Sequence, residues 1–253
     1  MLAIALQSGS NGNSIYVEAN GIKLLFDAGI SGKQAQQRLA ARGRDIRQVN
    51  ALIVSHHHAD HVRCVGIYNR KFGLPIYATP GTLEAAGHSL GRIQDARAFD
   101  AGQEIDFGGV VVQTIPTPHD GTDGVAFVVD DGRRRLGILT DLGHVFAGLE
   151  DTVRSLNAVL IESNYDPEML ASGPYPAFLK QRIRGPSGHI SNIEAAGLLA
   201  AAAGKRMKWA YLAHLSEQNN RPRLALATHR KILGKGLPLG VAGRYEATRI
   251  LEV

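Results

Sequence analysis

The chain has 253 residues, 44% of them hydrophobic, which is enough to bury the core of one large α/β domain without disulfide bonds. Its single cysteine, Cys64, excludes an internal disulfide, no apolar run reaches the roughly 20 residues that span a bilayer, and the start MLAIALQSGS lacks signal-peptide character, so we expect a cytoplasmic protein. The formal net charge of +5 favours an anionic partner without identifying one.

The first half of the chain begins with a predicted β-hairpin. The segments SIYVEA and IKLLFDAG flank Asn20-Gly21, a pair that suits a tight turn because both residues tolerate positive φ. Residues 31–43 start with a serine suited to an N-cap, carry apolar residues at helical spacing and end in glycine, so they predict a helix. The apolar run ALIVS that follows predicts a buried strand.

The remaining chain alternates strand-like and helix-like segments. Segments rich in β-branched or aromatic residues predict six more strands: PIYAT, VVVQTIP, GVAFVVD, RLGILTD, NAVLIES and WAYLAHL. The segment SNIEAAGLLAAAAG predicts a helix, since Ser191 and Glu194 form a capping-box pattern and Gly204 follows. No repeat or long linker divides the chain, so we expect one α/β unit over residues 1–253, with two sheets inside and helices outside.

Acidic and imidazole side chains follow five of the apolar strands. These candidates are His56, His58, Asp60 and His61 after ALIVS, His119 after VVVQTIPTP, Asp141 after LGILT, Glu162 at the end of AVLIE, and His214 after WAYLA. Strand ends hold side chains rigidly while the adjacent loops admit a substrate. Nitrogen and carboxylate donors suit divalent cations, so the pattern predicts that these strand ends converge on a metal cluster.

Each candidate also has a simpler interpretation. His119 or His214, taken singly, suits a hydrogen-bonded structural histidine, and Asp141 suits a turn cap. The shared strand-end position favours the metal role for all three. His57 is expected in solvent, because its neighbours on either side point the other way. The histidines without a strand-end position are interpreted as structural or surface residues: His88, His144 and His229.

The order HxHxDH, a later His, an Asp after a strand and a final His resembles that of the metallo-β-lactamase fold hydrolases. Longer stretches, including LQSGSNGNSIYVE, LLFDAGISGKQ, HADHVRCVGIYNRKFGLPIYAT, LIESNYDPEMLASGPYPAFLKQRI and LAHLSEQNN, resemble the YycJ (WalJ) family of that superfamily over nearly the whole chain. The resemblance implies a four-layer αββα sandwich, a site for two divalent metal ions, and 5′→3′ exonuclease activity on DNA.

The resemblance also implies roles for the individual candidates. It assigns the first metal to His56, His58 and His119, the second metal to Asp60, His61 and His214, and a bridge between the two metals to Asp141. Glu162 and His189 resemble the acid and histidine with which tRNase Z protonates its leaving group. The residues before His189 differ slightly from the expected pattern, and His57 replaces the more common Glu at a position that is not a ligand.

The mechanism implied is two-metal phosphodiester hydrolysis, in which Asp60 and Asp141 are catalytic as well as metal-binding. Two ions about 3.5–4 Å apart lower the pKa of a shared water from about 15.7 toward about 7, so that hydroxide attacks the phosphate. His189 then protonates the departing sugar oxygen, and Glu162 holds its ring. The donor set suits Zn²⁺, with Mn²⁺ and Fe²⁺ as alternatives.

Substrate-binding candidates lie close to these residues in the sequence. Ser216 and Asn219 follow the last ligand and suit a phosphate oxygen, although a plain turn uses the same residue types. The basic residues between Glu162 and His189 suit a nucleic-acid backbone: Lys180, Arg182 and Arg184. Arg133, Arg134 and Arg135 are interpreted as a solvated turn. The expected partner is a nucleic acid, DNA in preference to RNA, and the sequence does not predict an oligomeric state.

Two other functions are compatible with the same metal ligands. A small-molecule thioester or lactone hydrolase of the same fold has less need of a leaving-group acid or of a basic approach to the site. A non-catalytic regulator, stabilised by its ions, requires closed metal coordination. The interval from Asp141 to His189 is too short for the large β-CASP insertion of related nucleases.

Overall fold

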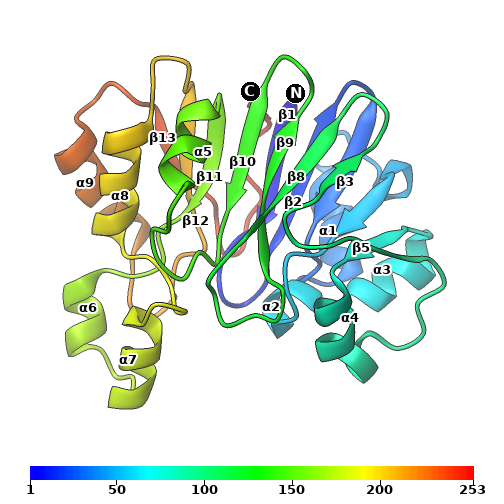
Figure 1. Ribbon diagram of the computed structural model, residues 1–253, viewed down its shortest axis with the longest axis horizontal. Helices are drawn as coiled ribbons and strands as arrows, with labels where there is room; N and C mark the ends of the chain where they lie inside the picture. Colours follow the sequence, from blue (N-terminus) through cyan, green and yellow to red (C-terminus); the bar gives the residue numbers. More distant parts are fainter.

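The computed structural model describes residues 1–253 and contains two seven-stranded sheets that pack face to face (Figure 1). The first sheet has, in spatial order, β14 (Leu251–Glu252), β1 (Leu2–Gln7), β2 (Ser14–Ala19), β3 (Ile22–Phe26), β4 (Ala51–Ile53), β5 (Ile76–Ala78) and β6 (Ala96–Ala98). The second has β13 (Leu239–Val241), β12 (Trp209–Ala213), β11 (Ala158–Glu162), β10 (Arg135–Leu139), β9 (Val125–Asp130), β8 (Val111–Pro116) and β7 (Glu104–Asp106).

Helices cover the outer faces of both sheets (Figure 1). The first sheet is covered by α1 (Gly32–Ala40) and α3 (Val65–Phe72), and the second by α5 (Leu149–Ser155), α8 (Asn192–Ala202) and α9 (Pro222–Leu233). The short helices are α2 (Ala59–Val62), α4 (Pro80–Ala86), α6 (Pro167–Ser172) and α7 (Ala177–Arg184), with 3₁₀ turns at Ile46–Gln48 and Gly87–Leu90. No helix combines the length and the apolar character that crossing a bilayer requires.

Alternation along the strands creates three apolar layers. In β1, Ala3 and Ala5 face the second sheet, whereas Ile4 and Leu6 face the outer helices. Because both faces of this strand are covered, it is almost continuously apolar and does not show the alternation of a half-exposed strand. The inner layer lies between the sheets and the two outer layers lie under the helices, so the predicted αββα sandwich is confirmed.

Most of the predicted elements are confirmed. The hairpin joins β2 to β3 through Asn20 and Gly21, both at positive φ. The capping box at Ser191 opens α8, and the six predicted strands are β5 and β8–β12. The first helix ends at Ala40, earlier than residues 31–43 predicted, because the chain leaves the helix before Gly43. Not predicted were β1, the short strands β6, β7, β13 and β14, and the helices α2 to α7.

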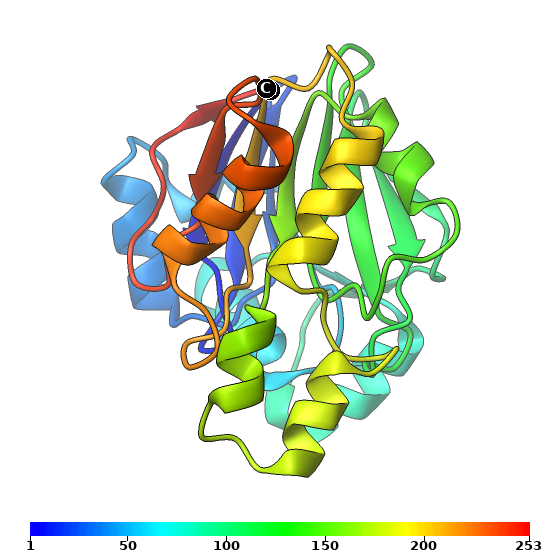
Figure 2. The same cartoon turned by 90° about the vertical axis from the view of Figure 1, so that its left-hand side faces the viewer.

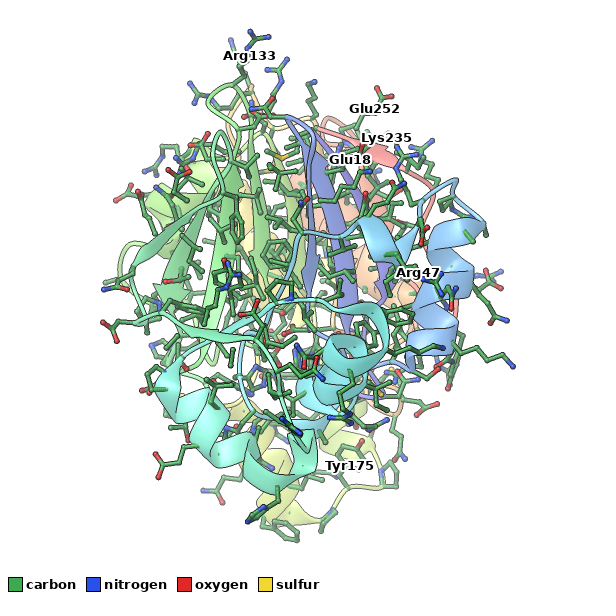
Figure 3. All side chains as sticks on the ribbon, turned by 90° about the vertical axis from the view of Figure 1, so that its right-hand side faces the viewer. Glu18, Arg47, Arg133, Tyr175, Lys235 and Glu252 are labelled. Atoms are coloured by element: carbon green, nitrogen blue, oxygen red, sulfur yellow. The ribbon has the colours of Figure 1, made fainter.

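The strand directions bring the candidate residues to one edge of the sandwich. Strands β10, β11 and β12 are parallel neighbours, β8 runs in the same direction as β10, and β4 belongs to the parallel part of the first sheet. In Figure 3 Arg133, in the β9–β10 turn, lies at the opposite end of the molecule from Tyr175, which precedes α7. The carboxyl ends of parallel strands are where α/β sheets bind ligands, so this edge is where a site is expected.

Candidate metal centre and active site

Three imidazoles converge beyond the ends of β4 and β8. His56 Nε2 lies 3.0 Å from His58 Nδ1, and His119 Nε2 lies 3.3 Å from the same atom. Zn–N bonds of 2.0–2.1 Å in tetrahedral geometry place ligand nitrogens about 3.3 Å apart. The spacing of these three nitrogens therefore fits one divalent cation held between them.

A second group lies beside the first. His214 Nε2 is 3.2 Å and His61 Nε2 is 3.4 Å from Asp60 Oδ2, so the three donor atoms also surround one point. Asp141 faces both groups, with Oδ2 3.3 Å from His61 Nε2 and Oδ1 3.8 Å from His119 Nε2. The structure thus brings together all seven residues that the sequence proposed as metal ligands.

One buried oxygen fits a cation bound in this cluster. Asp141 is 3% exposed, and its Oδ2 atom has no hydrogen-bond partner. A buried carboxylate oxygen without a donor is costly, because desolvation is not compensated. The donor set and the orphaned oxygen together fit a divalent metal, which is the chemistry that the fold implies.

Backbone strain accompanies the site. Asp27, Asp141 and His214 adopt positive φ of 61°, 57° and 53°, directly or soon after β3, β10 and β12. Left-handed conformations cost non-glycine residues about 1–3 kcal/mol each and tend to lie at functional sites. Here each turn leaves the strand end sharply and keeps the side chain among the clustered ligands.

Hydrogen bonds behind the ligands fix which ring nitrogen faces the cluster. His61 Nδ1 donates to Asp27 Oδ2 over 2.7 Å, and Asp27 is itself held by the amide and hydroxyl of Ser55. His119 Nδ1 donates to the carbonyl of Gly188 over 2.8 Å. Both rings therefore turn Nε2 toward the cluster, where it is the ring atom available to a metal.

Replacing Asp27 with asparagine is expected to weaken metal binding about 10- to 100-fold, because the neutral amide holds the His61 ring less firmly and lowers its basicity. Asparagine keeps the shape and tolerates the left-handed backbone. Competition with a chromophoric chelator measures the affinity. Asp151→Asn, at an exposed carboxylate on α5, is the matched control, and equal affinities in the two variants would contradict the role of Asp27.

The two histidine groups differ electrostatically. Burial, together with repulsion from neighbouring imidazoles, lowers the pKa of His56 well below its usual value and that of His58 to about 4. Burial also opposes protonation of His214, but Asp141 and Asp60 outweigh it and raise its pKa to about 10. A cation entering the second group thus displaces protons that the carboxylates attract, so metal affinity should increase with pH.

Glu162 and His189 form a second chemical unit beside the cluster. His189 Nδ1 donates to Glu162 Oε1 over 2.6 Å, while Glu162 Oε2 accepts from the amide of Leu142. Burial opposes ionisation of the Glu162 carboxyl, but attraction and hydrogen bonding from His189 and His214 hold its pKa far below the usual range. Glu162 is fully buried, whereas the His189 side chain is 20% exposed and lines the pocket at the cluster.

The cluster opens into a pocket of about 180 Å³. Two of the predicted substrate-binding residues, Ser216 and Arg182, line it. Asn219 does not: it is fully buried, its side chain donates to Ser216 Oγ, and its carbonyl accepts from the amide of Asp166. It therefore supports the loop instead of contacting a phosphate in this conformation.

The other two basic residues also lie outside the pocket lining. Lys180 Nζ donates to the carbonyl of Ala171, and neither Lys180 nor Arg184 is among the lining residues. Since 180 and 184 share one face of α7 while Arg182 lies on the other, only Arg182 faces the cluster. The remaining histidines do not join the donor groups: His57, His88, His144 and His229.

Several supporting residues were not predicted from the sequence. Asn13 Nδ2 lies 3.1 Å from Asp60 Oδ2, and Asp120 Oδ1 lies 3.4 Å from the Nε2 atoms of both His58 and His119. Asp120 also pairs with Arg182 across the pocket mouth. The strand-end pattern that identified the ligands also applies to Asp27, which follows β3. The polar loop SGSNGNS after β1 is the sequence signal that could have identified Asn13.

Comparison with known proteins shows which proteins this sequence resembles. The family model of the metallo-β-lactamase superfamily matches residues 8–173. The chain is 36% identical to the exodeoxyribonuclease YycJ of Bacillus anthracis over 94% of this chain and 91% of that protein. It is 38% identical to the exodeoxyribonuclease WalJ of Streptococcus pneumoniae over 88% of this chain and 84% of that protein.

The solved structures agree on the fold. The metallo-β-lactamase fold protein YhfI of Bacillus subtilis superposes with a TM-score of 0.76 at 15% identity, over 98% of this chain and all of that one. Such a low identity shows the architecture alone, whereas the identities to YycJ and WalJ extend over nearly complete chains. The chain is a metallohydrolase-fold protein that binds divalent metal, and it belongs to the YycJ/WalJ family of the metallo-β-lactamase superfamily.

Proposed function

We propose that this chain is a metal-dependent exodeoxyribonuclease that hydrolyses phosphodiester bonds from the 5′ end of DNA. The observation that carries the proposal is the Glu162–His189 pair, which lies at the same pocket as the metal ligands. An acid at this position serves a reaction in which a poor leaving group departs. The relatives named as exodeoxyribonucleases support the same reaction and DNA as the substrate.

The metal centre is proposed to hold two divalent ions, Zn²⁺ in preference to Mn²⁺ or Fe²⁺. His56, His58 and His119 would hold the first ion, Asp60, His61 and His214 the second, and Asp141 would contact both. Bound there, the ions would supply Lewis acidity for the attacking water and for the phosphate, an effect worth several kcal/mol. Because β4 and β10–β12 belong to different sheets, the site needs both of them, and residues 1–253 are proposed to form one catalytic domain.

His189 is proposed to give a proton to the departing sugar oxygen. Its Nδ1 atom is engaged by Glu162, which leaves Nε2 as the atom that reaches the substrate. The buried Glu162 carboxylate stabilises the protonated ring and sets its orientation. As the bond between phosphorus and the sugar oxygen breaks, the proton moves from Nε2 to that oxygen and the ring becomes neutral.

Polar groups at the pocket position the phosphate. The Ser216 hydroxyl lines the pocket beside His214 and suits a phosphate oxygen, and Arg182 carries a positive charge at the mouth. Lys180 and Arg184 are proposed as more distant guides for the backbone. A cytoplasmic location is proposed for this activity.

The alternative is hydrolysis of a small thioester or lactone. Neither substrate needs a leaving-group acid as strongly as a phosphodiester does. The names of the YycJ and WalJ relatives do not favour thioester or lactone hydrolysis. Four of the other curated relatives are named ribonuclease Z, so RNA is the competing polymer.

Arg182→Ala is expected to reduce the slope of log kcat/KM against log salt concentration by about 1, because one phosphate contact is lost. Steady-state cleavage of a labelled oligonucleotide at several salt concentrations gives the slope. Arg133→Ala removes an equal charge at the opposite end of the molecule and serves as the control. An unchanged slope in Arg182→Ala would show that the backbone follows another path.

The proposed function is tested with purified, metal-loaded protein and end-labelled single- and double-stranded DNA and RNA. We expect DNA to be shortened progressively from the 5′ end and a chelator to stop the reaction. RNA degraded in preference to DNA, or internal cuts without end-dependent products, would refute the proposal. Hydrolysis of a thioester or lactone without any cleavage of nucleic acid would support the alternative.

A further inference from the structure

We propose that the segment from α6 to α7 forms a base-binding wall of the active site, on which Tyr175 stacks against the base of the terminal nucleotide. The inference rests on the proposed function and adds a binding subsite to it. The base-binding wall consists of Tyr175, Leu179 and Ile183.

The wall and the metal ligands share one pocket. Tyr175, Leu179 and Ile183 line it together with His58, His119 and His189. These three are the only apolar residues among the twelve that line the pocket. A terminal nucleotide whose phosphate lies at the metal ligands would therefore meet an apolar surface on this side.

The wall is a separate structural unit built on its own small core. Figure 2 shows α6 and α7, in yellow-green, below the layers of sheet and helix. Residues of α7 line the pocket at the metal ligands. Tyr165, Leu170 and Ile183 form an apolar cluster distinct from the three main ones, and Tyr175 and Leu179 pack against it while staying partly exposed. The half-buried Tyr175 ring is thus supported from behind and accessible from the pocket.

Polar contacts connect the segment from α6 to α7 with the loops that carry the metal ligands. Arg182, on α7, forms a two-nitrogen ion pair with Asp120 Oδ2, at 2.7 Å from Nε and 2.6 Å from Nη2. Asp120 directly follows His119. At the other end of the segment, the amide of Asp166 donates to the carbonyl of Asn219 over 2.8 Å. The segment that carries Tyr175 is therefore connected to the site on both sides of the ring.

The chemistry of the wall fits a nucleobase. The phosphate and sugar of a nucleotide are polar and gain little from an apolar surface, whereas every base presents a π-face to an aromatic ring. Stacking of this kind tolerates all four bases, which suits an enzyme that must remove nucleotides in succession. The pocket of about 180 Å³ is small beside the roughly 300–1,000 Å³ of drug-sized sites, so it suits part of one nucleotide better than a long stretch of polymer.

The test combines a protein change with a substrate change. Tyr175→Ala is compared with the unmodified chain on DNA whose terminal nucleotide, at the end where degradation starts, carries either a base or an abasic analogue. We expect Tyr175→Ala to lower kcat/KM about 5- to 150-fold on the normal end, which is the range for one stacked base. On the abasic end the two proteins should differ by less than about 2-fold, because no base remains to stack.

Two further variants separate stacking from damage to the fold. Tyr175→Phe keeps the ring and should retain activity on the normal end. Phe178, in the same segment, is 73% exposed and does not line the pocket. Phe178→Ala removes its aromatic ring and should behave like the unmodified chain on both ends. Equal losses of Tyr175→Ala activity on normal and abasic ends would overturn the inference and indicate a purely structural role.

Two outcomes with the unmodified chain separate the base-binding wall from the exonuclease activity. An unmodified chain that degrades DNA at the same rate with and without a terminal base refutes the base-binding wall and leaves the exonuclease intact. An unmodified chain that binds metal but degrades no DNA refutes both.

Discussion

Asp141→Asn is expected to remove at least one metal ion and to lower DNA hydrolysis on the order of 10³-fold or more. The reason is geometric, since Asp141 is the one carboxylate that faces both donor groups. The loss of several kcal/mol of metal-dependent stabilisation corresponds to that factor at about 1.4 kcal/mol per tenfold change in rate. Asparagine keeps the volume and tolerates the positive φ of 57°, so the fold should persist.

Metal content by mass spectrometry and single-turnover cleavage of labelled DNA measure the two effects together. Asp151→Asn, on the exposed surface of α5, controls for the loss of one charge. An Asp141→Asn protein that retained both ions and full activity would show that Asp141 does not bridge the two groups. Thermal unfolding of the metal-free proteins would establish whether any loss reflects the fold instead of the site.

His189→Ala is expected to keep its metal and to cleave DNA about 10²- to 10⁴-fold more slowly, the range for loss of a general acid. His189 is not one of the seven proposed ligands, so metal content should not change. The defect should shrink strongly on a p-nitrophenyl ester of thymidine monophosphate, because p-nitrophenolate leaves without a proton. The measurement is the rate on DNA divided by the rate on the activated ester, compared between His189→Ala and the unmodified chain.

Equal slowing of the two substrates would argue against proton donation and in favour of a role in binding the phosphate. Glu162→Gln provides a second comparison, since it preserves shape but removes the charge that stabilises the protonated ring. This variant should also affect DNA more than the activated ester. Because Glu162 Oε2 accepts from the Leu142 amide, metal content and thermal stability should be measured alongside.

The layered fold and the ligand cluster could be predicted from the sequence because both depend on patterns that recur along the chain. Apolar runs of strand length recur, and a polar donor follows five of them. Parallel strands end at a common edge, so the donors had to meet there once the strand directions were right. The strands β6, β7, β13 and β14 have two or three residues each. Unlike the equally short β4 and β5, they include segments such as ARA and EID that carry no apolar run to recognise.

The supporting residues were harder to predict because sequence position does not reveal which side chains are buried. Asn219 and Ser216 are both short polar residues after the last ligand, yet only Ser216 reaches the pocket and Asn219 is enclosed. Along α7, helical spacing separates Arg182 from Lys180 and Arg184 but does not say which face turns inward. Phe178 is exposed and Ile183 is buried on the same helix, so hydrophobicity alone does not identify the face that turns inward.

The most direct test of the account is anomalous diffraction from crystals of the zinc-loaded protein. It should reveal two ions at about 2.0–2.3 Å from their ligand atoms. The first is expected among His56, His58 and His119, the second among Asp60, His61 and His214, and Asp141 should bind both. A single ion, or two ions whose ligands exclude Asp141 or His214, would contradict the conclusion that these strand ends build a dinuclear centre.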